Sequence, residues 1–414
     1  MKISLNTDSK IILKNLSYLT VLKVLNIGIK IVLAGYLIRI LGELNYGIIT
    51  WVDSVVQYFI MIINFGFNIY AAKYIVEHKN QDTKINEIIS SIFYIKGILF
   101  ISSIFCILFL GQFNEFSSYK NLLLLFMFCG IGEVLFPIWF FQGVENLKPA
   151  TIIVFFSRLF LLISTILFVK ATTHVEVYVF LLVISSILMG LLGFWYVFKY
   201  YNIKLIKVSF ESIKNYFKES LPFFLGRFLS LVFNFGTIFF IGKFCEFEQV
   251  AGFDISLKII MLAVIPFEML QQAVFPTISR TKDKKLLRKL ILMAVILGTI
   301  LGAIIFLMSE KLLYLLGGET IILFSSTLKL LSLLSPFVAL TFILGTCSLV
   351  AFGYYREYNF SLIFTSIIYI LILFSLYYLH QITFLNLIYL RVFGDVLMVV
   401  IRLYFSVKKR VLII

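Results

Sequence analysis

One stretch of the chain places four polar side chains at spacings that suit one face of a helix. Asp53, Gln57, Asn64 and Asn68 lie at offsets of 0, 4, 11 and 15 residues in the otherwise apolar run 42–74. At about 100° per helical residue, these offsets fall within roughly 60° of one another. Lipid cannot satisfy polar side chains, so such a stripe must face protein or trapped water. The stripe predicts either hydrogen bonding between helices or the wall of a hydrated substrate path.

A second stripe of the same kind lies in the apolar run 250–275. Asp254, Lys258, Glu268 and Gln272 have offsets of 0, 4, 14 and 18 residues, which again define one narrow face. The repetition favours the hydrated path, although Asp254 and Lys258 are spaced to neutralise each other.

Basic side chains precede both stripes. Each set has the spacing i, i+3, i+7 on an apolar helix: Lys23, Asn26 and Lys30 in the first, and Arg227, Ser230 and Asn234 in the second. Lys23 and Lys30 are about 10 Å apart along the helix axis, so at least one should lie well inside the bilayer. Such residues are costly there unless they face water or an anion.

The elements that position these residues are membrane-spanning helices. With 61% apolar residues, 14% charged residues and a mean hydropathy of +1.04, the chain is predicted to be an all-α polytopic membrane protein. About twelve spans are expected, at 16–37, 47–71, 91–110, 121–142, 151–169, 177–198, 220–242, 250–275, 290–308, 321–343, 360–379 and 384–405. No cleavable signal peptide is evident. The four cysteines and three histidines have no ligand spacing, so we expect neither a metal site nor a cofactor.

The distribution of positive charge predicts the orientation. The predicted cytoplasmic segments contain 22 of the 36 Lys and Arg residues, whereas the outer loops contain five. By the positive-inside rule, both termini are cytoplasmic. The net charge of +15 is therefore mostly a topology signal, and nucleic acid is not an expected partner.

The two sets of basic residues and stripes predict an internal repeat. We expect an N-terminal six-helix bundle at 1–198, a cytoplasmic amphipathic linker at 199–219 and a C-terminal six-helix bundle at 220–414. Because each bundle has an even number of helices, the two repeats are expected to be parallel. We expect a central cavity between them, lined first by spans 1, 2, 7 and 8. In the linker, apolar and charged faces predict an interfacial helix or a simple basic connector.

Several further side chains inside spans form a second tier of candidates. These are Glu133, Arg158, Glu268 and Lys329. Lys96 is close enough to the cytoplasmic end of its span to snorkel, and a structural and a functional role are equally expected. Arg391 and Asp395, at i and i+4, are expected to neutralise each other in a structural role.

Span four carries two residues with positional meaning. Pro137 is expected to kink the helix, and Trp139 suits an interfacial aromatic belt.

The charges inside the spans favour an anionic substrate. Nine basic and five acidic residues lie in the predicted spans, and Lys and Arg stabilise phosphate more strongly where water is scarce. Phosphate- or pyrophosphate-bearing lipids and acidic sugars are the candidates. An enzyme is not expected, since the outer loops are short and phosphate-loop, nucleophile-elbow and metal motifs are missing. A channel is disfavoured because no filter-like loop repeats.

Several diffuse motifs carry a resemblance to a known family. They are Leu41-Gly42 with Tyr46-Gly47, Phe65-Gly66-Phe67-Asn68, Pro137-Ile138-Trp139-Phe140-Phe141-Gln142-Gly143, Leu221-Pro222-Phe223-Phe224, and Ile265-Pro266-Phe267-Glu268 through Phe275-Pro276-Thr277. In this order, over essentially the whole chain, they resemble the Wzx-type O-antigen and polysaccharide flippases. That family lies in the superfamily of MATE multidrug exporters and lipid II flippases.

The resemblance implies a function and a location. It implies a flippase that moves undecaprenyl-pyrophosphate-linked oligosaccharide units across the bacterial inner membrane by alternating access. Proton or sodium coupling, known in some relatives, does not transfer residue by residue. Other glycan-assembly membrane proteins are potential partners. The alternatives are a MATE-like ion-coupled exporter, which needs a carboxylate-rich cavity, and a membrane glycan polymerase or ligase, which needs a large outer loop.

Within this hypothesis, the head group and the cavity walls have assigned residues. Lys23, Lys30 and Arg227 are assigned to the anionic head group. Asp53 orients them or carries a coupling proton. Asp254 and Lys258 line the opposite wall.

Overall fold

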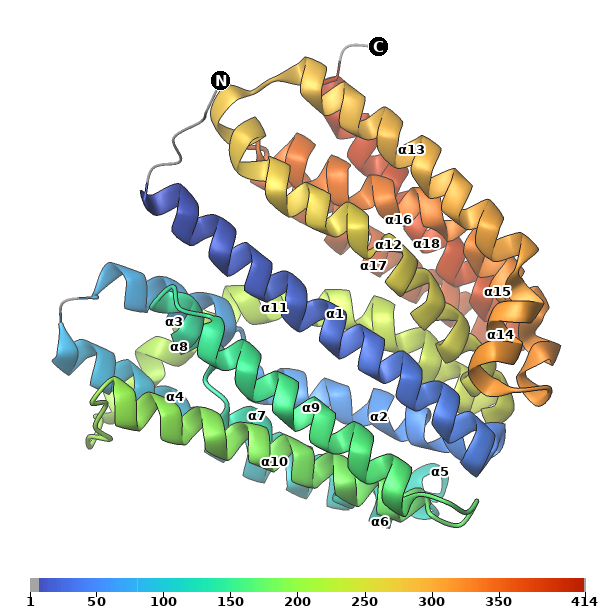
Figure 1. The fold of residues 1–414 in the computed structure, drawn as a ribbon, viewed down its shortest axis with the longest axis horizontal. Helices are drawn as coiled ribbons and strands as arrows, with labels where there is room; N and C mark the ends of the chain where they lie inside the picture. The colour runs from blue at the N-terminus through green and yellow to red at the C-terminus, as the bar shows by residue number, and fades with distance from the viewer. Residues whose placement is uncertain (1–6, 80, 413–414) are drawn as a thin grey trace. The chain divides into compact units, whose positions relative to one another are not determined.

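The backbone is described for residues 7–79 and 81–412 in a computed structural model, with side chains throughout except at residues 7–17, 19, 226, 227 and 229–234. Every regular element in these ranges is a helix (Figure 1). The first ten are α1 (Thr7–Leu41), α2 (Glu43–Asn64), α3 (Phe67–Glu77), α4 (Asp82–Leu110), α5 (Asn114–Ser117), α6 (Lys120–Met127), α7 (Cys129–Leu135), α8 (Ile138–Gly143), α9 (Lys148–Phe168) and α10 (Val175–Tyr200). They are followed by α11 (Phe210–Phe244), α12 (Phe247–Thr281), α13 (Lys284–Leu307), α14 (Ser309–Gly317), η1 (Thr320–Phe324), α15 (Ser325–Ser332), α16 (Leu334–Phe342), the π-helix η2 (Ile343–Val350), α17 (Tyr355–Tyr378) and α18 (Phe384–Lys408).

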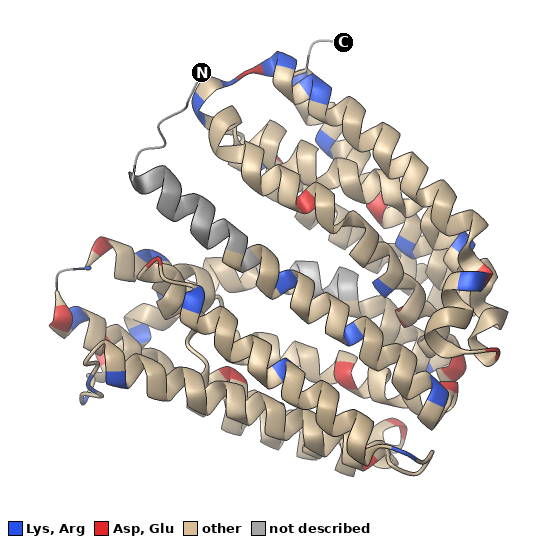
Figure 2. Cartoon of the chain, viewed as in Figure 1, with Lys and Arg blue, Asp and Glu red and all other residues tan. Residues whose placement is uncertain are grey.

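The expected membrane fold is confirmed. In the described residues, ten helical segments are long and apolar enough to cross a membrane, and the bent pair Thr320–Ser332 and Leu334–Val350 would make an eleventh. Figure 2 shows charged residues at helix ends and also singly along the helices, with long uncharged stretches between them. The number twelve stays a prediction, because the expected span 220–242 lies in α11, where several side chains are not described.

The chain forms two compact units that do not follow chain order. Unit 1 comprises Met1–Asn26 and Trp51–Leu231, and unit 2 comprises Ile27–Thr50 and Val232–Ile414. The boundaries fall inside α1, α2 and α11, so each of these helices contributes to both units. The predicted division into 1–198, 199–219 and 220–414 stays a prediction. The interfacial helix expected in the linker differs in the structure: residues 202–209 are not helical, and α11 continues as one helix from Phe210.

In unit 1, the second predicted span is broken where α2 meets α3. Phe65 and Gly66 have φ values of 36° and 75°, which end the helix. Gly66 also packs tightly, because a Cβ atom there would lie 2.8 Å from the Phe224 nitrogen and the Ser220 carbonyl oxygen. Only glycine combines this positive φ with so close an approach to another backbone. Asn68 therefore lies on α3, beyond the break, and does not continue the stripe on α2.

The predicted kink at Pro137 is confirmed, and the predicted position of Trp139 is wrong. The chain leaves helical geometry at Phe136 and Pro137, between α7 and α8. Trp139 is only 1% exposed and belongs to the apolar core of unit 1 with Phe67, Ile75 and other residues of α3 and α4. The break turns α8 so that its aromatic side chains face this core, and lipid-headgroup contact is lost.

Unit 2 contains a bent span and a fixed C-terminal end. The bend of 46° between α15 and α16 precedes Pro336, whose missing N–H is tolerated in the first turn of a helix. The Lys284 ammonium donates to the Arg410 carbonyl at 2.6 Å, so the start of α13 lies beside the C-terminal end of α18. There the Lys409 ammonium hydrogen-bonds the Glu357 carboxylate at 2.7 Å, which raises the pKa of Lys409.

Candidate substrate-binding site

Arg158 and Asn26 meet inside unit 1. The Arg158 Nε donates to the Asn26 Oδ1 at 3.0 Å, and both side chains are half-buried. The contact joins α9 to the N-terminal part of α1. Within the described residues, Arg158 has no carboxylate in ion-pair contact. A cation inside an apolar span and held only by an amide is suited to bind an anion.

The α2 stripe is partly engaged with its own helix and partly with α7. The Gln57 amide donates to the Asp53 Oδ1 at 2.8 Å, one turn away. The Asn64 amide donates to the Glu133 Oε2 at 3.1 Å. All four side chains are half-buried. The structure thus brings Asn64 and Glu133 together, and Asp53 lies in the same unit.

Lys96 has a different role from snorkelling, and that prediction is wrong. Its side chain is 1% exposed, and its ammonium donates to the Glu133 backbone carbonyl at 2.8 Å. In a continuous helix, this carbonyl would accept the N–H of residue 137, but Pro137 has none. The Lys96 ammonium therefore donates to the carbonyl that the proline leaves without an N–H partner. This hydrogen bond stabilises the break between α7 and α8.

Unit 2 contains a three-residue cluster around Asp254. The Tyr46 hydroxyl donates to the Asp254 Oδ2 at 2.5 Å, and the Lys258 ammonium lies 2.8 Å from the Tyr46 oxygen. Lys258 also forms an ion pair with Asp254. The Asp254 side chain is 8% exposed, whereas Lys258 is 25% exposed. The carboxylate is thus buried with two donors, and the ammonium still reaches a solvent-accessible surface.

The first turns of α2 can reach α12 because Gly47 allows it. A Cβ atom on Gly47 would lie 1.9 Å from the Phe247 carbonyl oxygen, so any other residue would separate the two helices. The neighbouring Tyr46 is thereby placed over Asp254 and Lys258, with its ring 5.5 Å from the ammonium.

The two lysines assigned to the head group differ in their surroundings. Lys23 is half-buried and belongs to unit 1, whereas Lys30 is exposed and belongs to unit 2. Arg227 and Asn234 lie outside the described side chains. The assignment of Lys23, Lys30 and Arg227 to an anionic head group stays a prediction.

The remaining candidates in unit 2 have local partners. Gln272 donates to Glu268 at 3.4 Å, one turn along α12. Lys329 pairs with Glu310 at 2.9 Å, on exposed surface between α15 and α14. The expected pairing of Arg391 with Asp395 is confirmed at 3.3 Å.

The sequence places this chain in a known family. A profile of the family described as "Polysaccharide biosynthesis protein" matches residues 12–282, which is more than half of the chain. The chain belongs to this family. The predicted resemblance to polysaccharide transporters is therefore confirmed.

Two relatives in Escherichia coli (strain K12) and Shigella dysenteriae carry the name "Putative O-antigen transporter". The first is 22% identical over 387 residues, covering 90% of this chain and 91% of the relative. The second is 25% identical over 263 residues, covering 63% of this chain and 65% of the relative.

Solved structures of transporters share the fold. An inward-facing multidrug resistance transporter of the MATE family superposes with a TM-score of 0.73 at 14% identity, over 94% of each chain. The lipid II flippase MurJ, in an inward closed conformation, has the same TM-score at 14% identity, over 94% of this chain and 87% of its own. At these identities, the likeness shows a shared fold and no more.

Sequence reasoning missed Tyr46 in the unit 2 cluster and the backbone acceptor of Lys96 in unit 1. In the sequence, Tyr46 was noted only as part of the Tyr46-Gly47 motif. An uncharged tyrosine in an apolar run does not indicate by itself that it contacts a buried ion pair. Lys96 was noticed, but its acceptor could have been inferred only by pairing it with the carbonyl four residues before Pro137.

Proposed function

We propose that this member of the polysaccharide biosynthesis family is a flippase that carries undecaprenyl-pyrophosphate-linked oligosaccharide units across the bacterial inner membrane. It acts as a transporter and not as an enzyme. The family membership over residues 12–282 and the names of its relatives support this function. Both termini are cytoplasmic in this proposal, because 22 of the 36 Lys and Arg residues lie in the segments on that side.

The observation that carries the proposal is the Arg158–Asn26 contact in unit 1. Arg158 is a half-buried cation with an amide as its partner, so it can bind a pyrophosphate oxygen without breaking an ion pair. Asn26 holds the guanidinium in place and can donate through its own amide nitrogen. Lys23 lies three residues before Asn26 and adds positive charge to this face of α1. Alternating access requires two bodies that move, and in this proposal they are the two compact units.

Coupling is assigned to Asp254 in unit 2. This carboxylate is nearly sealed and held by Tyr46 and Lys258, so adding a proton to it removes the charge that both partners bind. A proton is therefore the proposed coupling ion. Export driven by a sodium gradient, and unaffected by a pH gradient, would contradict this assignment. Interaction with other glycan-assembly membrane proteins stays a prediction.

The test is to delete the gene and locate the lipid-linked glycan. We expect it to accumulate on the cytoplasmic leaflet, with loss of surface polysaccharide and rescue by the intact gene. At equal protein levels, Arg158→Ala should lower export about tenfold or more, because one charge-assisted contact is lost. Arg158→Lys keeps the charge and should retain more activity.

Two results would redirect the proposal. Surface glycan that is unchanged by the deletion, together with altered sensitivity to cationic drugs, would identify a multidrug exporter. Full export by Arg158→Ala in a strain that depends on the gene would remove Arg158 from the head-group site and leave the flippase function standing.

A further inference from the structure

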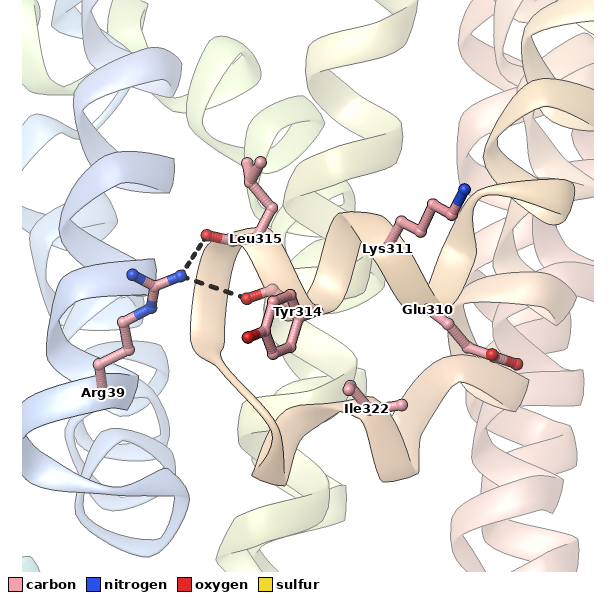
Figure 3. A pocket seen from close by; sticks show the side chains of 6 residues that line it. All are labelled: Arg39, Glu310, Lys311, Tyr314, Leu315 and Ile322. Carbon is pink, nitrogen blue, oxygen red and sulfur yellow. Dashed lines mark hydrogen bonds between the residues drawn. The ribbon is translucent and has the colours of Figure 1, made fainter.

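An unassigned pocket lies in unit 2 beside α14. It has a volume of about 720 Å³. The residues that line it are Arg39, Glu310, Lys311, Tyr314, Leu315 and Ile322 (Figure 3). Arg39 comes from the C-terminal turn of α1, and the other residues come from α14 and η1.

The pocket is preformed by contacts between backbone and side chain. The Arg39 Nη2 donates to the carbonyls of Tyr314 and Leu315, at 3.2 and 2.5 Å. Both carbonyls lie in the last turn of α14, where the Tyr314 carbonyl also accepts the Gly318 N–H at 3.0 Å, and the negative end of the helix dipole favours a cation there. At Gly35, one turn earlier, a Cβ atom would lie 2.5 Å from the Leu316 carbonyl oxygen, so α14 packs directly on α1.

Two of the three charged side chains that line the pocket are engaged within the protein. Glu310 is paired with Lys329, and the partial negative charge of the α14 terminus offsets Arg39. Lys311 is the remaining exposed charge, and Figure 3 shows its ammonium turned away from Arg39. The two cations of the lining do not converge on one point, as the binding of an anionic head group would require. The pocket favours a neutral ligand that offers many hydroxyl groups.

The shape of the lining also suits a sugar ring. The Tyr314 side chain is 53% exposed, and Figure 3 shows its ring between Arg39 and Ile322. An aromatic face and neighbouring aliphatic groups bury the C–H face of a pyranose. Both bonds of Arg39 to α14 use Nη2, so its Nε and Nη1 donors have no partner among the described residues and are available to hydroxyl groups.

The pocket lies on the side of unit 2 opposite the C-terminus. α13 begins beside Arg410 and has 24 residues, a length of about 36 Å, which is enough to cross the hydrocarbon core. α14 follows at its far end. With the C-terminus cytoplasmic, the pocket faces outwards, where the glycan must leave the protein.

We infer that this pocket is a carbohydrate subsite that binds a sugar residue of the transported glycan on the outer side of the membrane. The inference rests on the proposed flippase function for its substrate class. Tyr314 supplies the stacking face, and Glu310 and Arg39 supply hydrogen bonds to hydroxyl groups. Arg39 also holds α14 in place, so its loss would move the pocket as well as remove a ligand.

The test uses the full chain in lipid nanodiscs and the repeat-unit oligosaccharide released by mild acid from the host's lipid-linked pool. Binding is measured by isothermal titration calorimetry. Tyr314→Ala should weaken binding about tenfold, because the stacking face is lost while the backbone carbonyls that bind Arg39 remain. Tyr314→Phe keeps the ring and should stay within about threefold of the native protein. Tyr378→Ala is the matched control, since Tyr378 is 76% exposed and outside the pocket.

The outcomes separate this inference from the proposed function. The inference is overturned if the native protein does not bind the oligosaccharide, or if Tyr314→Ala binds it as tightly as the native protein does. It is also overturned if Tyr378→Ala weakens binding as much as Tyr314→Ala. If gene deletion leaves surface glycan unchanged, the flippase function fails, whatever the pocket binds.

Discussion

Two acid–base pairs in unit 2 have the same spacing and similarly buried carboxylates, but their basic partners differ in exposure. Asp254 and Lys258 on α12, and Arg391 and Asp395 on α18, are each separated by four residues. The α18 pair is sealed, with side chains 2% and 9% exposed. In the α12 pair, the lysine is 25% exposed, and a third group, Tyr46, comes from another helix.

The comparison shows that spacing alone does not separate structural from functional charges. Burying both charges of a sealed pair costs much desolvation free energy. The pair contributes to stability mainly because each charge neutralises the other, so that neither is buried unpaired. An open pair with a third partner can change its protonation or exchange a partner without unfolding the helix. Lys96 of unit 1 belongs with the sealed group, because its partner is a backbone carbonyl. Arg402 of unit 2 also belongs with the sealed group. Its Nη1 donates to the backbone carbonyl of Thr341, next to the π-helix η2, at 2.7 Å.

Breaking the sealed pair should have the largest effect. Arg391→Met leaves the Asp395 carboxylate buried without its ion-pair partner, which should cost about 3–5 kcal/mol of unfolding free energy. The free energy is measured on purified protein in detergent, by the reaction of the buried thiols of Cys129 and Cys347 with a maleimide dye during denaturation. The double variant Arg391→Met with Asp395→Leu is the control and should recover most of the loss. If the single variant were as stable as the native protein, the pair would not be a sealed structural unit.

Removing Lys96 should have an intermediate effect, of about 1–3 kcal/mol, because a buried carbonyl loses its donor. Lys96→Met is measured in the native chain and in the Pro137→Ala background. Alanine at position 137 brings back an N–H that the Glu133 carbonyl can accept, so Lys96→Met should cost less there. The double-mutant cycle measures this coupling. Strictly additive costs would show that Lys96 does not brace the proline break.

Interactions within one helix could be predicted from the sequence, because helical geometry alone determines them. The apolar spans indicated the all-helical membrane fold. The four-residue spacing placed Asp254 beside Lys258 and Arg391 beside Asp395, and both pairs form. The kink at Pro137 followed from the missing N–H in the same way.

Interactions between helices could not be predicted, because they depend on packing. Nothing in the spacing brings Arg158 to Asn26, which are 132 residues apart, or Tyr46 to Asp254, which are 208 apart. Trp139 was misplaced for the same reason: a tryptophan near a predicted span end suits either the lipid interface or a core, and the helix break decided between them. Phe65 adopts a positive φ that its side chain does not favour, and only the adjacent glycine hinted at a break.

Changing the α12 cluster should affect transport more than stability, and this prediction tests the comparison directly. Asp254→Asn keeps the shape of the side chain and an acceptor for Tyr46, so stability should change little, while export should fall about tenfold or more because the protonatable group is gone.

Tyr46→Phe should have the smallest effect, about 0.5–1.5 kcal/mol in stability and a few-fold decrease in export, since one hydrogen bond is lost and the ring remains over Lys258. Export is measured as surface glycan per molecule of protein, with Tyr389→Phe on exposed α18 surface as the matched control. If Asp254→Asn instead lost stability as Arg391→Met does and exported normally per folded molecule, the α12 pair would be as structural as the α18 pair, and proton coupling would have to be sought at Asp53 or elsewhere.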